Sequence, residues 1–482
     1  MNLKFNKLLL ITGLFFSIID FDLINAATKD SLKSKVQIHK KIDSDNTRKC
    51  EVFNEINLTS LQDIAINKNK DLENTKLNIE AAEHTKNFYK KYLWPTLSIT
   101  ATIDKAIDEW TDTNTEIKGT GLKVNTYSLS STNTNTLQAD IIWNILNPSI
   151  YSNIKSANFD LKNTQYLSQS AFNELLKNLR LAAISVNEQS QNIESTKESI
   201  SRAKKLLEIA ESLFDAGFIS RQDLLRQQNH LLQYENLLKD NKIYFNLTLN
   251  NLNLLLNNEY SGCPYKALDS IQYISSKSKK ISSNNSDLIL LAFRNRSDIK
   301  SLEAQIKSKE ASIEYYKRAS LPLTSLYISS TLYNYNYDEN AYYSNERKID
   351  TYYDDYSFGI STTSKFSGGQ NKSMIKNLKV QIEALNNNYK NLKDTIVYEI
   401  NNLLYERDTL KEQFDISKEQ YSKARETYNA IEQTFAQGYS TMTELLDAQR
   451  MLSSSQKSLI RNESERAKNL VKLFREISFG EL

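Results

Sequence analysis

Residues 214–225 read FDAGFISRQDLL, and residues 435–446 read FAQGYSTMTELL. Each stretch ends one long helical pattern and begins another. Gly217 and Gly438 suit the left-handed backbone position just past a helix C-terminus, because glycine has no Cβ to clash there. We therefore predict a tight helix-turn-helix tip at each stretch. Because the pattern lies twice in one chain, we interpret the chain as a tandem repeat.

The residues after the two glycines predict how the next helix begins. Ser220 and Thr441 suit the N-cap position, where a side-chain oxygen accepts a hydrogen bond from a free backbone N–H group. Asp223 and Glu444 follow three residues later, so S-x-x-D and T-x-x-E are both predicted to be capping boxes.

The N-terminus has the pattern of a secretory signal peptide. Lys4 and Lys7 precede an apolar run over residues 8–19, and a small residue, Ala26, provides a cleavage point. The alternative is an N-terminal membrane anchor, but the run is shorter than an ordinary membrane span. We therefore expect residues 1–26 to be removed and the protein to be exported.

Composition and cysteine count narrow the possible functions. The chain has 482 residues and a net charge of +3, so it shows no electrostatic footprint for nucleic acid. Cys50 and Cys263 are its two cysteines. In an oxidising compartment they could form a disulfide, and two unpaired thiols are the alternative. Neither directly follows the signal peptide, so no lipid-anchor cysteine is expected.

The repeat can be aligned by residue number. Leu61 and Pro95 match Leu288 and Pro322 with a shift of 227 residues, whereas the tip glycines differ by 221. The second repeat is therefore six residues shorter between its proline and its tip. The predicted segments are an N-terminal extension at 27–57, a first repeat at 58–257, a connector at 258–286, a second repeat at 287–477 and a C-terminal tail at 478–482.

Each repeat is predicted to have a helix, two strands, a very long helix, the tip and a further helix. Strands are indicated around 96–103 and 137–143, where apolar and polar residues alternate, with a similar pattern after Pro322. Such a strand has one apolar face, which meets a core in a soluble protein and lipid in a membrane barrel. We expect polar loops at about 104–134 and 333–355, the second rich in tyrosine.

The long helices carry the strongest periodic signal. Small or apolar residues step by three and four from Ile154 to Phe214, and from Ile375 to Phe435. Both runs contain a double four-residue step, at 175–179 and 396–400, which locally unwinds a coiled coil. Each helix would be about 100 Å long at 1.5 Å per residue, so it needs neighbouring helices along its whole length.

These features, in this order and twice, resemble the TolC-like outer membrane efflux proteins over roughly residues 58–477. The resemblance implies a mainly α fold with a small β part. A long α-helical coiled-coil barrel would join a transmembrane β-barrel, with four strands from each chain and twelve in the trimer. Elementary physics agrees, because four strands cannot close a barrel and lipid does not tolerate an open strand edge.

The resemblance also implies a function and partners. The protein would be an outer membrane channel-tunnel extending into the periplasm, the exit duct of a tripartite efflux pump or type I secretion system. It would form a homotrimer in outer membrane lipid and act with a periplasmic adaptor (membrane fusion) protein and an inner-membrane transporter. The tips would dock on the adaptor through Gly217, Phe218, Ser220, Asp223, Gly438, Tyr439 and Thr441.

The acidic residues of the second tip are candidates for a gate. By resemblance, Asp447 and Glu444 would ring the narrow periplasmic end of the tunnel and favour cations. Helix capping explains Glu444 equally well, whereas it explains Asp447 less well, so Asp447 is the stronger candidate. The family's closed-state lock uses a tyrosine and an arginine, and here Phe435 and Ser440 stand at those positions, which puts that lock in doubt.

No residue pattern supports an enzyme. His39, His84 and His230 are scattered, without a nucleophile or a metal-ligand cluster, and there is no phosphate-binding glycine loop. We expect no cofactor and no metal, and we place His84 and His230 at a helix surface or groove. The alternative function is a coiled-coil interaction protein of the periplasm or cell surface without a pore. The alternating strands at matching places favour the duct.

Overall fold

The computed structural model describes residues 54–116, 119–121, 123–257, 265–267, 270–271, 274, 284–341 and 347–478. The predicted signal peptide lies outside the described residues, as do Cys50 and Cys263. Most of the predicted N-terminal extension, connector and C-terminal tail also lie outside them.

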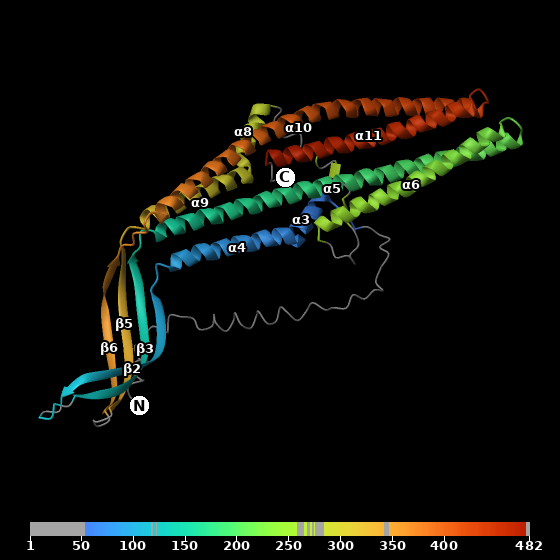
Figure 1. Cartoon of the computed structure of the whole chain (residues 1–482). Helices are drawn as coiled ribbons and strands as arrows, with labels where there is room; N and C mark the ends of the chain where they lie inside the picture. The colour runs from blue at the N-terminus through green and yellow to red at the C-terminus, as the bar shows by residue number, and fades with distance from the viewer. Residues whose placement is uncertain are drawn as a thin grey trace. The chain divides into compact units, whose positions relative to one another are not determined.

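Two successive sets of elements follow the same order (Figure 1). After β1 (Asn54–Ile56), the first set is α3 (Leu58–Lys68), α4 (Lys70–Lys91), β2 (Thr96–Glu116), β3 (Lys123–Leu146), α5 (Ile150–Asp215) and α6 (Arg221–Leu255). After β4 (Tyr265–Ala267), which pairs with β1, the second set is α8 (Asn285–Asn295), α9 (Ser297–Arg318), β5 (Leu323–Ala341), β6 (Arg347–Thr363), α10 (Gln370–Ala436) and α11 (Met442–Glu476). The predicted fold class, mainly α with a small β part and an internal repeat, is confirmed.

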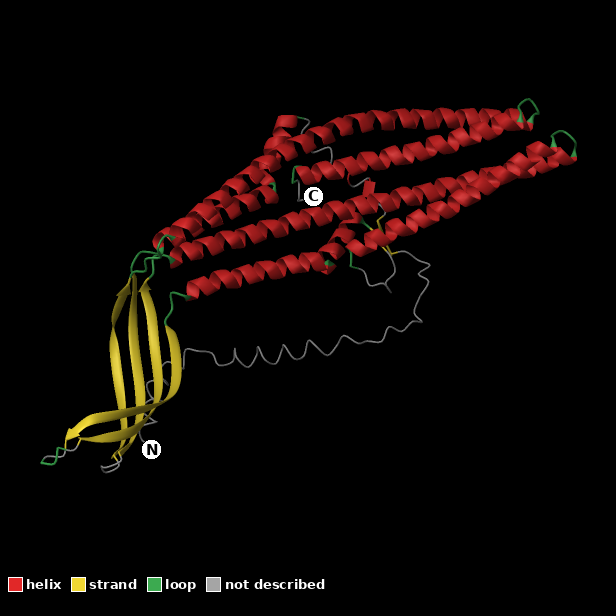
Figure 2. Cartoon of the chain, viewed as in Figure 1, coloured by secondary structure: helices red, strands yellow, loops and turns green. Residues whose placement is uncertain are grey.

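One antiparallel sheet contains the four long strands in the order β2-β3-β5-β6 (Figure 2). Its register aligns apolar residues across all four strands: Leu97 pairs with Ile141, Ile141 with Ile328, and Ile328 with Phe358. One face is therefore apolar near the helices. Strands β2 and β6 are the two edges of the sheet. Among the described strands, β2 pairs only with β3 and β6 pairs only with β5.

The predicted polar loops at 104–134 and 333–355 are wrong in extent. β2 continues to Glu116 and β3 begins at Lys123, while β5 continues to Ala341 and β6 begins at Arg347. The stretches are polar, but antiparallel pairing supplies backbone hydrogen bonds regardless of side-chain polarity. Cross-strand partners such as Tyr333 and Tyr353, which stack with ring centroids 4.5 Å apart, add stabilisation that a single strand cannot reveal.

The long helices α5 and α10 bury the seams that the sequence predicts. Every predicted seam residue of α10 is buried or half-buried. Of the predicted seam residues of α5, Ala171 is exposed and the others are buried or half-buried. Helix α11 contributes to three hydrophobic clusters, one shared with α3, α5 and α6, one at the tips, and one shared with α8 to α10. None of the described helices is long and apolar enough to cross a membrane.

His230 corrects one expectation, because it lies in the interior and not at a surface or groove. It is only 3% exposed, and its ring packs edge-on against Tyr234 with centroids 4.8 Å apart. Burial, assisted by the positive charge of Arg450, lowers the pKa of His230 to about 4. The side chain is therefore neutral in the folded protein at pH 7. His84, in contrast, is exposed.

We expect the folded protein to lose stability as pH falls from about 6.5 towards 4. The unfolded chain binds a proton at His230 with the ordinary pKa of about 6.5, while the folded chain does not. Between pH 7.5 and 5.0 the loss from this group is about 2 kcal/mol. Thermal unfolding followed by circular dichroism at the two pH values measures it.

The matched variants are His230→Met and His84→Met. Methionine suits the buried site, because it is an unbranched apolar side chain that adapts to irregular core gaps. The His230 variant should show a smaller fall in melting temperature at pH 5.0 than the parent, and the His84 variant should behave as the parent. Equal falls in all three proteins would contradict the assignment.

Candidate functional site at the two helix-turn-helix tips

The first tip is a Schellman motif, a helix end closed by two backbone hydrogen bonds. Gly217 has φ +76°, its N–H donates to Phe214 O at 2.9 Å, and Phe218 N–H donates to Leu213 O at 2.8 Å. The positive φ requires glycine or a residue that tolerates the left-handed region. The sequence prediction of a left-handed helix end is therefore confirmed here.

The second tip has the same backbone. Gly438 has φ +80° and its N–H donates to Phe435 O at 2.9 Å, while Tyr439 N–H donates to Thr434 O at 2.9 Å. Nothing lies within 4 Å of a Cβ built on either tip glycine, so the requirement is one of backbone conformation and not of space.

The two N-caps differ in a way the sequence did not predict. Thr441 and Glu444 form the full capping box. The Glu444 N–H donates to Thr441 Oγ1 at 3.3 Å, and the Thr441 N–H donates to Glu444 Oε2 at 2.8 Å. At the first tip, Asp223 N–H donates to Ser220 Oγ at 3.2 Å, but the Ser220 hydroxyl donates to the Asp223 carboxylate at 2.6 Å. Aspartate is one methylene shorter than glutamate, so the predicted S-x-x-D box forms only in half.

Each turn presents one aromatic ring to the outside. Phe218 is 79% exposed and Tyr439 is 83% exposed, although both are large side chains that would be buried in an ordinary core. The helices behind the turns share one hydrophobic cluster, which contains residues of α5, α10 and α11. The two turns that carry these rings lie at the same end of the two hairpins (Figure 1), next to this shared cluster.

The two acidic candidates of the second tip have different local partners. The carboxylate of Glu444 caps α11, as described above. Asp447 has a 64% exposed side chain and pairs with Arg450 on the same helix, at 3.5 Å. The corresponding residue of the first tip is Arg226, which pairs with Asp223 at 3.2 Å. The two tips thus have the same backbone conformation and differ in the charge of this side chain.

Phe435 and Ser440, which stand where the family's lock residues are expected, have local structural roles. Phe435 is 5% exposed and belongs to the hydrophobic cluster behind the tips. The Ser440 hydroxyl makes a hydrogen bond with the Thr434 hydroxyl, on the last turn of α10. On the same helix, burial raises the pKa of the Tyr428 hydroxyl. The Glu432 carboxylate, which accepts a hydrogen bond from this hydroxyl at 2.9 Å, raises the pKa further.

Polar residues that sequence reasoning missed join α5, α6 and α11 behind the tips. Gln449 Nε2 donates to Ser199 O at 3.3 Å, and the Ser199 and Ser453 hydroxyls lie 2.9 Å apart. The Tyr234 hydroxyl donates to Ser453 Oγ at 3.0 Å. In the sequence these residues stand out only as serine and glutamine at the three- and four-residue spacing of a helix seam. Exposed helix positions carry the same residue types, so this pattern does not identify the contacts. These hydrogen bonds fix the register of one hairpin against the other.

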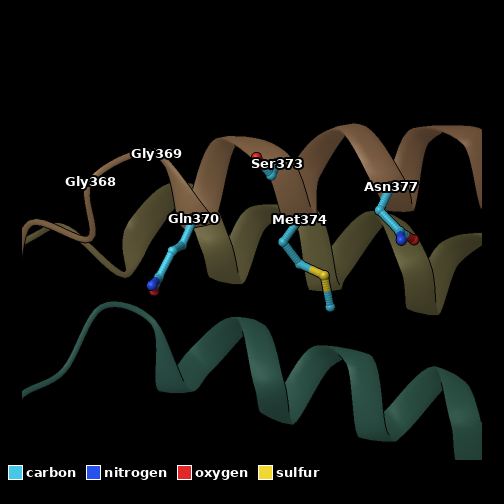
Figure 3. A pocket seen from close by; sticks show the side chains of 6 residues that line it. All are labelled: Gly368, Gly369, Gln370, Ser373, Met374 and Asn377. Carbon is cyan, nitrogen blue, oxygen red and sulfur yellow. The ribbon is translucent and has the colours of Figure 1, made fainter.

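An open groove lies at the start of α10 (Figure 3). Its lining brings no charged side chain and consists of Gly368, Gly369, Gln370, Ser373, Met374 and Asn377. Among the described residues, no group of three or more His, Cys, Asp or Glu side chains could hold a metal ion.

Several solved structures share the fold of this chain. The outer membrane channel CmeC of Campylobacter jejuni matches with a TM-score of 0.67 at 18% identity, over 88% of this chain and 86% of that one. The outer membrane protein VceC of Vibrio cholerae matches at 0.61 and 13%, over 87% and 95%. The open state of the MtrE channel of Neisseria gonorrhoeae matches at 0.58 and 19%, over 87% and 88%. At these identities the likeness shows the fold.

Sequence comparison shows the family. No curated protein matches the chain significantly. The family described as outer membrane efflux protein matches residues 61–258 and 288–477, which are the two halves of the internal repeat and most of the chain. The chain therefore belongs to the outer membrane efflux protein family, a family of efflux channels that lie in the cell outer membrane and extend into the periplasm.

Proposed function

We propose that the chain is the exit duct of a tripartite efflux pump or a type I secretion system. In this role a homotrimer passes cargo from an inner-membrane transporter through the periplasm to the outside. The observation that carries the proposal is a four-stranded sheet whose two edge strands pair with no further strand of the described chain. Its strands continue into helices of 66 and 67 residues. In lipid, open edges leave backbone groups without partners, and strands from three chains remove every edge.

The two faces of the sheet fit a barrel wall. Ile99 is 65% exposed and Phe358 is 86% exposed on the apolar face, where no other part of the described chain covers them. On the other face, Ser98 pairs with Asp140 and Asp140 with Ser329. An apolar outer face and a polar inner face are what a water-filled channel in lipid requires.

We expect the detergent-solubilised protein to have about three times the mass of one chain, because three four-stranded sheets close into a twelve-stranded ring. Ile99→Arg puts a charge on the apolar face and should cost about 2–4 kcal/mol if it meets the bilayer midplane. The yield of trimer from outer membranes should fall. Ser98→Arg, one residue away on the polar face, is the control and should leave the yield unchanged. A stable folded monomer, or equal losses in both variants, would refute the barrel.

The tips are the proposed docking surface for a periplasmic adaptor. Their exposed aromatics, Phe218 and Tyr439, sit on turns whose backbone is fixed by the Schellman motifs, so little ordering is needed when a partner binds. Gly217, Ser220, Asp223, Gly438 and Thr441 hold that backbone in place. Rigid exposed aromatic side chains are frequent anchors of protein interfaces.

The double variant Phe218→Ser and Tyr439→Ser should reduce export about tenfold or more, because each lost aromatic anchor costs about 2 kcal/mol. Export is measured in host cells as expelled compound or as secreted protein in the medium. The trimer yield should not change, since both rings are exposed. Phe218→Tyr with Tyr439→Phe is the control, because both exposed rings remain and export should stay at the parental level. Normal export by the double serine variant would count against docking through the tips.

Asp447 is the proposed gate residue, with Glu444 as a second, weaker ring. Three Asp447 carboxylates around a trimer axis would attract cations and repel anions at the constriction. The exposed Asp447 carboxylate is free of any capping role, whereas Glu444 is committed to Thr441 N–H. Their local contacts therefore favour Asp447 as the residue that meets permeating ions.

Asp447→Asn should lower the cation-to-anion permeability ratio of single trimers in planar bilayers and weaken block by multivalent cations. Asparagine keeps the shape of aspartate, so the helix should be unchanged. Glu444→Gln removes charge but can still complete the capping box, so its effect on selectivity separates the gate role from the cap role. Parental selectivity and block in Asp447→Asn would place this side chain away from the lumen.

A further inference from the structure

The polar face of the sheet carries a row of tyrosines. By the strand register, Tyr327, Tyr333, Tyr335 and Tyr337 of β5 share this face with Tyr353 of β6, and we call these five residues the tyrosine wall. The opposite face of the same two strands carries Leu326, Ile328, Phe358 and Ile360. Alternation along the strands therefore separates the tyrosine wall from the aliphatic face, and the proposed function puts the wall inside the barrel.

The rings of the tyrosine wall are held by neighbours on the sheet. Tyr333 and Tyr353 stack with their ring planes 13° apart. Tyr327 lies across β6 at Gly359, where a Cβ would come within 2.8 Å of the Tyr327 hydroxyl oxygen. Gly359 has an ordinary strand backbone, so the close approach of this ring is the reason that glycine fits there.

Among the residues of this face whose side chains the structure describes, every charged one is acidic. Asp140 shares it with the tyrosine wall and accepts hydrogen bonds from Gln138 at 2.9 and 3.0 Å. Asp355 pairs with Thr331 on the same face, and Asp104 pairs with Thr134. Over the parts of this face whose side chains the structure describes, no lysine or arginine is present. Aromatic faces beside carboxylates attract cations, and aromatic cations most strongly.

We infer that the tyrosine wall is a cargo-contact surface that favours organic cations with a flat aromatic group over aliphatic cations of equal charge. The inference rests on the proposed function, because it needs the polar face to line a water-filled channel. Carboxylates alone attract both kinds of cation equally. The tyrosine rings can stack on a flat aromatic cation, whereas carboxylates cannot, so the difference between the two kinds of cation reports on aromatic rings.

Single-channel recording of the full-length trimer in planar bilayers tests the inference. The probes are methyl viologen, a flat aromatic dication, and hexamethonium, an aliphatic dication, each added on the side of the strand ends remote from the helices. Methyl viologen should block at a concentration about two- to fivefold lower than hexamethonium, as expected for one cation–π contact at a wet site. An acidic gate at the tips acts on both dications, so it does not create this difference.

Variants assign the difference to the tyrosine wall. Tyr333→Leu with Tyr353→Leu should remove the preference for methyl viologen and leave hexamethonium block unchanged, while the matching pair of Phe substitutions should keep it. Tyr356→Leu, on the opposite face, should behave as the parent. Gly359→Ala displaces the Tyr327 ring from β6 and should lower the unitary conductance.

The possible results distinguish a failure of the tyrosine-wall inference from a failure of the proposed exit duct. Open channels that the two dications block equally, or a preference that survives the Leu pair, would overturn the tyrosine wall and leave the duct intact. A folded trimer that conducts no current would overturn the duct itself, and the wall with it. Parental conductance in Gly359→Ala would show that Tyr327 does not face the permeation path.

Discussion

The fold depends on burial along the two long helices. An isolated helix of 66 or 67 residues gains little from its own hydrogen bonds in water, so its stability must come from neighbours along its length. Helix α11 provides the central contact, because it packs against α10 and α5 and enters all three hydrophobic clusters. The two repeats are thereby joined into one packed helical body and not left as separate hairpins.

Buried polar contacts then fix how the helices align. Lys468 of α11 pairs with Glu188 of α5 at 2.8 Å, and both side chains are largely buried. At the end of α11, Glu476 pairs with the buried Arg296, which also holds Asp298 at 2.6 Å. A slipped register would leave such charges buried without partners, at a cost of several kcal/mol. These pairs therefore give the helical body one arrangement, which in turn sets the position of both tips.

The tips and the sheet show how one repeated backbone acquires two functions. The Schellman turns of the two repeats are the same, yet Asp447 stands where the first repeat has Arg226. In the sheet, β5 carries Tyr327 and Tyr333 on the polar face, where its repeat counterpart β2 carries Thr100 and Ala106. Duplication supplied the scaffold, and the departures from exact repetition mark the places where we propose ion selection and cargo contact.

The sequence alone determined the features that depend on local interactions. The tip glycines, the N-caps, the long helices with their seams and the strand starts after Pro95 and Pro322 could all be predicted, because each depends on residues a few positions apart. The family resemblance followed from their order. The candidate residues Asp447 and Glu444 could be named from the sequence. The sequence could not show that the Asp447 carboxylate is exposed while the Glu444 carboxylate caps α11.

Only the tertiary structure decided the features that depend on partners distant in the chain. The polar stretches expected to be loops are strands, because pairing across the sheet satisfies their backbone groups. His230 is buried, because the helices packed against α6 cover a face that its own sequence leaves polar. The tyrosine wall arises from the register of β5 on β6, which brings Tyr333 to Tyr353 and Tyr327 to Gly359. Periodicity fixes which residues share a face of one element, whereas packing decides what that face meets.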